Sequence, residues 1–208
     1  MRVIVGITGA TGAIFGIRCL QMLGAAGVET HLIMSPWAAS TISLETPYTP
    51  ADVKEMATYV YSYKDQSAPI ASGSYRVDGM IVAPCTVKTL AAIRVGLGEN
   101  LLTRAADVVL KERRKLVLMV REMPLGTIHL ENMLELSRIG AVIVPPMPAF
   151  YNQPETLADM VDHIVVRTLD QFDLDLAHDG RWQGMTVAKS ARGNCRGVSG
   201  LPGISQRT

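Results

Sequence analysis

The chain has 208 residues, 48% of them hydrophobic, and a formal net charge of +1 at pH 7. This length can bury the core of one compact domain, and the nearly neutral charge argues against an extended nucleic-acid surface. No run of 18 apolar residues occurs and a strand pattern begins at residue 2, so we expect no membrane span and no signal or transit peptide.

The first twelve residues join a β-branched apolar run to three glycines, Gly6, Gly9 and Gly12. They predict a strand over residues 2–8 and a helix over residues 13–26. Glycines let the backbone approach a ligand, and a helix N-terminus offers unpaired N–H groups to an anion. Hydroxyl groups at Thr8 and Thr11 are further expected donors. A nucleotide-phosphate site is therefore favoured over a turn that binds nothing, although the spacing is not the dinucleotide fingerprint.

The second predicted strand, residues 29–34, is followed by Ser35 and Pro36 rather than by an acidic side chain. Dinucleotide-binding folds usually place an acid about 20 residues after the glycine turn, so a mononucleotide such as FMN is favoured over NAD. Serine before proline is typical of a helix N-cap and predicts a helix over residues 37–44. Glu45 ends that helix, either facing the ligand crevice or lying on the surface.

Strand and helix patterns alternate along the rest of the chain. They predict a helix from residue 52 to about 61, a polar loop over 68–78, strands over 79–83, 116–120 and 141–144, and helices over 87–93, 101–113, 129–139 and 156–172. Apolar strands separated by helices indicate an α/β fold, a flavodoxin-like or Rossmann-like doubly wound parallel sheet in a three-layer α/β/α sandwich. One domain is expected over residues 1–184, followed by a disordered or non-native tail over 185–208.

Two later strand ends carry polar side chains. The segment 84–89 offers two threonine hydroxyls and Lys88 at a helix start, which indicates a third anion-binding or flavin-binding turn. Cys85 is interpreted as a packing thiol rather than a nucleophile, because no histidine lies nearby in the sequence. Arg121 and Glu122 follow the strand 116–120, a position that favours phosphate binding by arginine and proton transfer by glutamate.

Several other residues that could take part in binding or catalysis also have purely structural explanations. Arg104 and Lys111 lie on one helix face with Asp107 between them as a possible ion-pair partner. The proline-rich segment 145–151 indicates a ligand lid or a subunit contact. The three cysteines are far apart and the four histidines lack metal-ligand spacing, so a cytoplasmic, metal-free protein is favoured. Cys19 is expected to pack in the core.

Together these residues resemble the UbiX flavin prenyltransferases, including members labelled as phenolic or aromatic acid decarboxylase subunits. The likeness runs in order from residue 2 to about Gly184. The matching segments are Gly9–Gly12, Ser35, Leu44–Thr46, Pro84–Thr86, Thr103–Asp107, Leu110–Arg114, Arg121–Glu122, His129–Asn132, Gly140–Pro146 and Phe150–Tyr151. Thr11 departs from the serine common in the family, which keeps the hydroxyl and adds a methyl group.

The resemblance implies an enzyme that binds FMN and dimethylallyl phosphate without a metal. It would join the prenyl group to N5 and then C6 of reduced FMN, and the product would pass to a separate UbiD-type decarboxylase. The resemblance also implies a homododecamer with active sites shared between subunits.

The resemblance also implies roles for particular residues. FMN would be held by Gly9, Ala10, Thr11, Ser35, Thr86, Val87, Lys88, Thr89 and Arg121. The prenyl phosphate would be held by Lys111, Arg121, Glu122, Tyr151 and Arg167. The catalytic set would be Glu122, Glu45, Lys111 and Arg104, with Glu122 as proton donor to the departing phosphate.

Two other functions stay open at this point. A flavin-dependent cysteine decarboxylase of the same fold would use a catalytic histidine, whereas His31 is predicted in a strand and His129 and His163 on helices. A non-enzymatic FMN-binding or delivery subunit would not need five phosphate-handling charged residues together.

Overall fold

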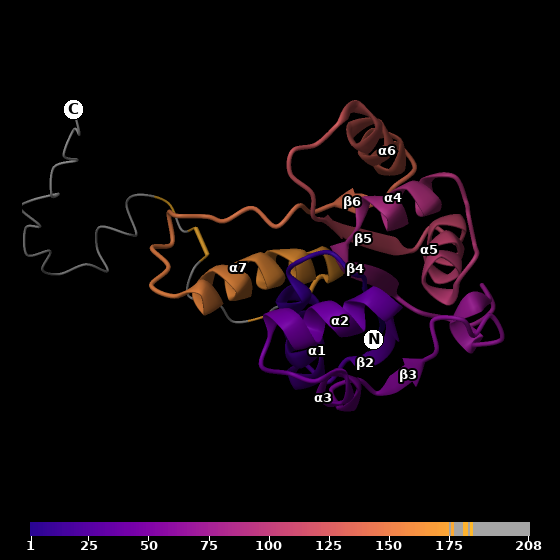
Figure 1. Ribbon diagram of the computed structural model, residues 1–208, viewed down its shortest axis with the longest axis horizontal. Coiled ribbons are helices and arrows are strands. Elements are labelled where there is room, and N and C mark those ends of the chain that lie inside the picture. The colour runs from indigo at the N-terminus through magenta and orange to yellow at the C-terminus, as the bar shows by residue number, and fades with distance from the viewer. Residues whose placement is uncertain (175, 177–180, 183, 185–208) are drawn as a thin grey trace, which may run out of the picture.

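The computed structural model describes residues 1–174, 176, 181, 182 and 184. The predicted tail over residues 185–208 lies outside the described residues. Figure 1 shows strands and helices alternating along the chain, with the sheet lying between helices. No helix among the described residues is both long and apolar enough to cross a bilayer.

Six parallel strands form one sheet, in the order β3-β2-β1-β4-β5-β6. They are β1 (Arg2–Ile7), β2 (Glu29–Met34), β3 (Tyr59–Tyr61), β4 (Gly79–Cys85), β5 (Lys115–Val120) and β6 (Val142–Ile143). The chain winds one way from β1 and the other way from β4, so a topological switch point lies between these strands. The predicted doubly wound parallel sheet is confirmed.

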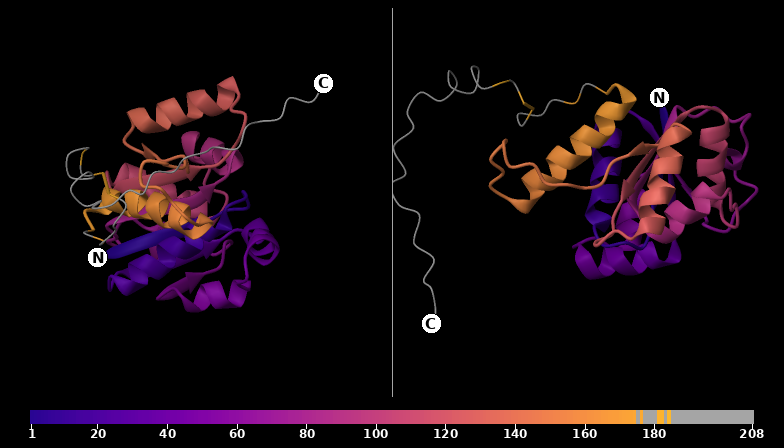
Figure 2. Two further views of the ribbon diagram at one scale, coloured as in Figure 1. Left: turned by 90° about the vertical axis from the view of Figure 1, so that its left-hand side faces the viewer. Right: turned by 90° about the horizontal axis from the view of Figure 1, so that it is seen from above.

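Helices cover both faces of this sheet (Figure 2). They are α1 (Ala13–Ala25), α2 (Pro36–Glu45), α3 (Pro50–Glu55), α4 (Val87–Arg94), α5 (Leu101–Lys111), α6 (Thr127–Arg138) and α7 (Leu157–Leu169), with short 3₁₀ turns η1 (Pro69–Ala71) and η2 (Asp170–Phe172). The core on one face includes side chains of α1 and α7, and the core on the other includes side chains of α4, α5 and α6.

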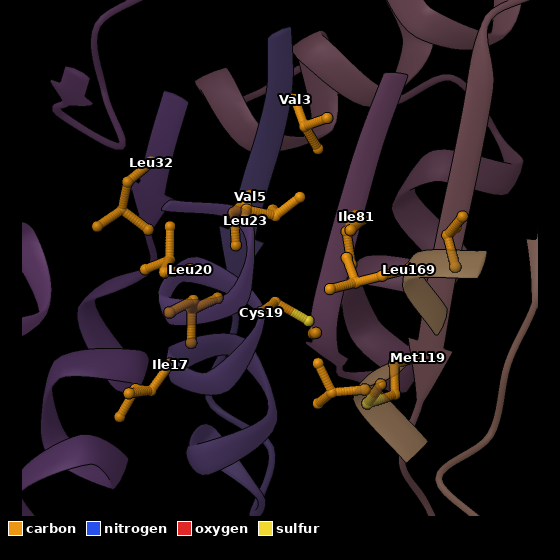
Figure 3. Close-up of a cluster of buried hydrophobic side chains, with 14 of the residues drawn as sticks. Val3, Val5, Ile17, Cys19, Leu20, Leu23, Leu32, Ile81, Met119 and Leu169 are labelled. Atoms are coloured by element: carbon orange, nitrogen blue, oxygen red, sulfur yellow. The ribbon is translucent and has the colours of Figure 1, made fainter. Parts of the chain in front are cut away.

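Alternating side chains of the central strands serve the two cores. Val3 and Val5 of β1 pack with Ile17 and Leu20 of α1, as Figure 3 shows, and Leu169 of α7 belongs to the same cluster. Ile4, between the two valines, packs into the core on the other face. A parallel sheet buried on both faces requires such continuous apolar strands, which is why their positions could be predicted from the sequence.

The predicted helix from residue 52 to about 61 is wrong after Glu55. Residues 59–61 form β3 at the edge of the sheet, paired with β2. Thr58, just before β3, holds the chain against β2. Its backbone N–H donates to Thr30 Oγ1 over 3.0 Å, and its hydroxyl accepts from Thr30 N–H over 3.1 Å. Tyr59-Val60-Tyr61 has strong β propensity, and an available strand partner decided the conformation.

Candidate functional site

Thr8 joins two turns at the switch point. Its hydroxyl donates to the Pro84 carbonyl over 2.6 Å and accepts from Thr86 N–H over 2.9 Å. Thr8 is 2% exposed, so these bonds are sheltered from water. The expected ligand donor at this position is thus engaged inside the protein, where it holds the β1 and β4 turns side by side.

The glycine turn after β1 lies directly against the start of α2. A Cβ built on Gly9 would come within 2.4 Å of the Trp37 Cβ, so only glycine fits here without movement. Gly12 is the N-cap of α1 and has a φ of 94°, a conformation that glycine adopts readily. Ala10 is half-buried and Thr11 is exposed beside them.

Two further helices begin at the same edge with the predicted hydroxyl caps. Ser35 Oγ accepts from Ala38 N–H over 3.1 Å at the start of α2, which also has proline in its first turn. Thr86 Oγ1 accepts from Thr89 N–H over 3.1 Å at the start of α4, and the Thr86 hydroxyl donates to Thr89 Oγ1 over 2.9 Å. Val87 is half-buried and Lys88 is exposed. Three helix starts therefore surround the switch point.

Glu45, at the far end of α2, reaches back to the start of α1. Its Oε2 accepts from Gly12 N–H over 2.7 Å and from Ala13 N–H over 3.3 Å. The carboxylate satisfies N–H groups that a glycine N-cap leaves without a local acceptor. The sequence reasoning missed this contact, because a bond across 33 residues has no local signal.

Arg121 and Glu122 lie at the same edge, next to the α4 turn. Arg121 N–H donates to the Cys85 carbonyl over 3.1 Å, and the Glu122 carboxylate accepts from Met123 N–H over 3.1 Å. Arg121 is exposed and Glu122 is half-buried. The structure therefore brings this pair together with the residues of the glycine turn and the two capped helices.

Both described thiols are buried. Cys19 and Cys85 are each 0% exposed, and burial raises the pKa of each thiol to about 12. The thiolate is the reactive form of cysteine, and a thiol with so high a pKa is almost never ionised at neutral pH. This favours the packing interpretation of both residues.

Arg104 and Lys111, both on α5, form their contacts with other residues of this chain. Arg104 donates from Nε to the Ala71 carbonyl over 3.1 Å and pairs with Asp107 over 2.8 Å, which confirms the predicted ion pair. Lys111 ends α5 and pairs with Glu112. Since β5 begins four residues later, Lys111 lies toward the amino edge of the sheet. The six residues of β5 span roughly 17 Å between that edge and Arg121.

A third group involves α7, which carries Arg167 and which Tyr151 contacts from the segment before it. The Tyr151 hydroxyl lies 3.2 Å from His163 Nε2, and its ring packs edge-on against Trp182. Arg167 follows His163 by one helical turn and pairs with Asp170 over 2.7 Å. The contacts of Tyr151 and Arg167 thus join them to α7 and to residues that follow it, whereas Lys111 lies toward the opposite edge of the sheet from Arg121.

Hydroxyls, backbone N–H groups and an arginine at the switch point of a doubly wound sheet suit a phosphate-bearing ligand, and the half-buried Glu122 adds a carboxyl group at the same edge. Among the described residues no three His, Cys, Asp or Glu side chains gather as a metal site. The fold and site define an α/β protein of the doubly wound class, whose members bind ligands at such a switch point.

Comparison with known proteins identifies the family. Residues 1–169 match the Flavoprotein family, and the chain belongs to it. A probable UbiX-like flavin prenyltransferase of Bacillus subtilis is 63% identical over 189 residues, which are 91% of this chain and 93% of the relative. The chain is therefore also a member of the UbiX flavin prenyltransferase family, as the sequence resemblance predicted.

Solved structures agree with this assignment. A dodecameric FMN-dependent UbiX-like decarboxylase of Escherichia coli O157:H7 is 61% identical with a TM-score of 0.87, covering 88% of this chain and 100% of the other. AnUbiX (PadA1), in complex with FMN and dimethylallyl pyrophosphate, is 54% identical with a TM-score of 0.85, covering 88% and 97%. A PPC decarboxylase mutant at 19% identity and a TM-score of 0.57 shares the fold alone.

Proposed function

We propose that this chain is a flavin prenyltransferase, which joins the dimethylallyl group of dimethylallyl phosphate to N5 and C6 of reduced FMN. The observation that carries the proposal is the Arg121–Glu122 pair, bonded through Arg121 N–H to the Cys85 carbonyl beside the α4 turn. This contact supports the proposal, because an arginine, which suits a phosphate, and a carboxyl group then lie at the edge where doubly wound sheets bind ligands. Close relatives carry the same activity in their names.

The switch-point residues fit FMN. Gly9 and Ala10 give a close backbone approach, and Thr11, Ser35, Thr86 and Thr89 bring hydroxyl groups. The remaining members of the proposed FMN set are Val87, Lys88 and Arg121. Reduced FMN supplies the nucleophilic N5 and C6 atoms when it is bound, and the protein groups bind and orient it.

The proposed chemistry depends on stabilising a departing phosphate. Lys111, Arg121 and Arg167 are the cations that would offset its growing charge, and Tyr151 adds a hydroxyl donor. Glu122 would give a proton to that phosphate. Glu45 and Arg104 complete the proposed pocket.

These groups would meet in an assembly of several copies. Lys111 lies toward the opposite edge of the sheet from Arg121 in one chain, so a neighbouring subunit would supply it. We propose that Tyr151 and Arg167 also reach the site across subunits and that the assembly is a dodecamer. Met147 and Phe150 in the proline-rich segment are each 69% exposed, which suits the predicted subunit contact better than a solvated loop. A dodecameric relative with 61% identity also supports this assembly.

The product would go to a UbiD-type decarboxylase, since a prenylated flavin is a cofactor rather than an end product. We place the flavoprotein domain at residues 1–184 and the protein in the cytoplasm. The free, buried Cys19 and Cys85 support that compartment, because exported proteins more often pair their cysteines.

The two alternative functions have less support. A cysteine decarboxylase would use a catalytic histidine, but His31 is 0% exposed in β2, stacked on Tyr59 and Tyr61, with burial lowering its pKa. A non-enzymatic FMN delivery subunit would not need the charged pair Arg121 and Glu122.

The test is an anaerobic incubation of the purified protein with reduced FMN and dimethylallyl phosphate, followed by mass spectrometry of the flavin. We expect the mass to rise by one C5H8 unit. Glu122→Gln should lower the rate about 10²- to 10⁴-fold, the usual contribution of a general acid, with FMN still bound. Glu131→Gln, an exposed glutamate on α6, is the matched control. Unchanged FMN that stays bound to wild-type protein would refute the transferase.

A further inference from the structure

Helix α2 holds the glycine turn from both ends. Trp37 in its first turn packs on Gly9, where a built Cβ would come within 2.4 Å of the Trp37 Cβ. Glu45, its last residue, accepts N–H bonds from Gly12 over 2.7 Å and from Ala13 over 3.3 Å. One ten-residue helix therefore fixes both limits of the turn from Gly9 to Gly12.

The start of α1 needs such a partner from outside. Gly12, its N-cap, has no side chain, and no acidic residue lies in the first turn of the helix. The first N–H groups of a helix lack internal acceptors, and the helix dipole places partial positive charge there. Glu45 meets both requirements from across the fold, and its carboxylate occupies the place that an anionic ligand would otherwise take.

We propose that Glu45 is a positioning residue, which locks the Gly9–Gly12 turn for flavin binding and closes the start of α1 to phosphate. The inference deepens the proposed flavin-binding function and rests on it. It differs from an acid–base role for Glu45, because its Oε2 acts on the turn through two backbone N–H groups. A neutral oxygen acceptor of the same length would keep most of this effect.

The test compares Glu45→Ala and Glu45→Gln with wild-type protein by FMN titration, following flavin fluorescence. We expect Glu45→Ala to weaken FMN binding at least tenfold, and Glu45→Gln to stay within threefold of wild type. Millimolar formate, but not chloride at equal ionic strength, should restore binding to Glu45→Ala by returning a carboxylate to the gap. Inorganic phosphate should compete with FMN more strongly in Glu45→Ala than in wild type. Glu55→Ala, an exposed glutamate ending α3, is the charge-matched control.

A second measurement does not depend on flavin. Amide hydrogen exchange of the peptide covering residues 9–15 should be faster in Glu45→Ala and near wild type in Glu45→Gln. Equal exchange and equal FMN affinity in all variants would overturn the positioning role, as would a Gln variant as impaired as Ala. Failure of wild-type protein to bind FMN, with the exchange difference intact, would instead count against the proposed function and leave the lock on the turn supported.

Discussion

Gly9 shows how a single missing methyl group brings two elements into contact. We predict that Gly9→Ala destabilises the fold by about 1–3 kcal/mol, because its Cβ would overlap the Trp37 Cβ at 2.4 Å. It should also weaken FMN binding, since the turn must shift. Urea unfolding and flavin titration would measure both effects.

Gly24 offers the control for this substitution. A Cβ built there meets nothing within 4 Å, and the residue lies inside α1. Gly24→Ala should therefore stabilise the protein by about 0.5–1 kcal/mol, since alanine loses less entropy in a helix. Equal effects of the two substitutions would contradict the packing argument at Gly9.

The buried thiols give a second prediction at the residue scale. Because the pKa of Cys19 and of Cys85 is raised to about 12, roughly one thiol in ten thousand is ionised at pH 8. In a Cys195→Ser background, a thiol reagent such as DTNB should modify almost no cysteine in the folded protein and both after denaturation. Rapid modification of the native protein would contradict this prediction, because it would mean that Cys19 or Cys85 is an accessible thiolate.

At the scale of the elements, the carboxylate of Asp170 stabilises the end of α7 by pairing with Arg167 and Arg181. Asp170 is partly buried, which alone would raise its pKa, but hydrogen bonds and charge from Arg181 and Arg167 lower the pKa below the usual 3.8. The folded protein therefore keeps this carboxylate ionised where the unfolded chain binds a proton. Its stabilising contribution is complete above about pH 4 and is lost as the pH falls through the lower, folded value.

Asp170→Asn should thus lower Tm by several degrees at pH 7, since about 1 kcal/mol corresponds to about 2–4 °C at this size. The difference from wild type should shrink as the pH falls from 4 toward 2. Asp173→Asn, an exposed neighbour, should match wild type throughout. If the difference in Tm between Asp170→Asn and wild type stays constant with pH, the ionisation of Asp170 is not its cause.

At the scale of the whole molecule, the separation of Lys111 from Arg121 and Glu122 has a direct consequence. If a proposed site takes Glu122 from one subunit and Lys111 from another, oligomers that mix Lys111→Ala and Glu122→Gln chains contain some intact sites. Random mixing in equal amounts leaves about a quarter of the sites with both native residues. We therefore expect two inactive variants to recover about a quarter of wild-type activity when co-expressed.

Prenyl transfer by the co-purified mixture, using two different affinity tags, would measure this recovery. Each variant expressed alone is the control. No recovery in verified mixed oligomers of two inactive variants would mean that both residues of a working site come from the same chain.

The element pattern was predictable because its causes are local. Continuous apolar strands indicate a sheet buried on both faces, and Ser35 before Pro36 indicates a helix start with its own cap. Arg121 and Glu122 could be chosen as site residues since they directly follow a buried strand, whose carboxyl end faces the ligand in this fold class. In contrast, residues 59–61 adopt a strand only because β2 offers them a partner.

The sequence by itself therefore determined the doubly wound fold, the three helix starts around the switch point and the family. Only the tertiary structure decided that Thr8 is used to join two turns, that Glu45 caps α1, and that Lys111 lies toward the opposite edge from Arg121. The physical reason is distance along the chain. Propensity, capping and apolar periodicity act over a few residues, whereas these contacts join segments that come together only when the sheet and helices pack.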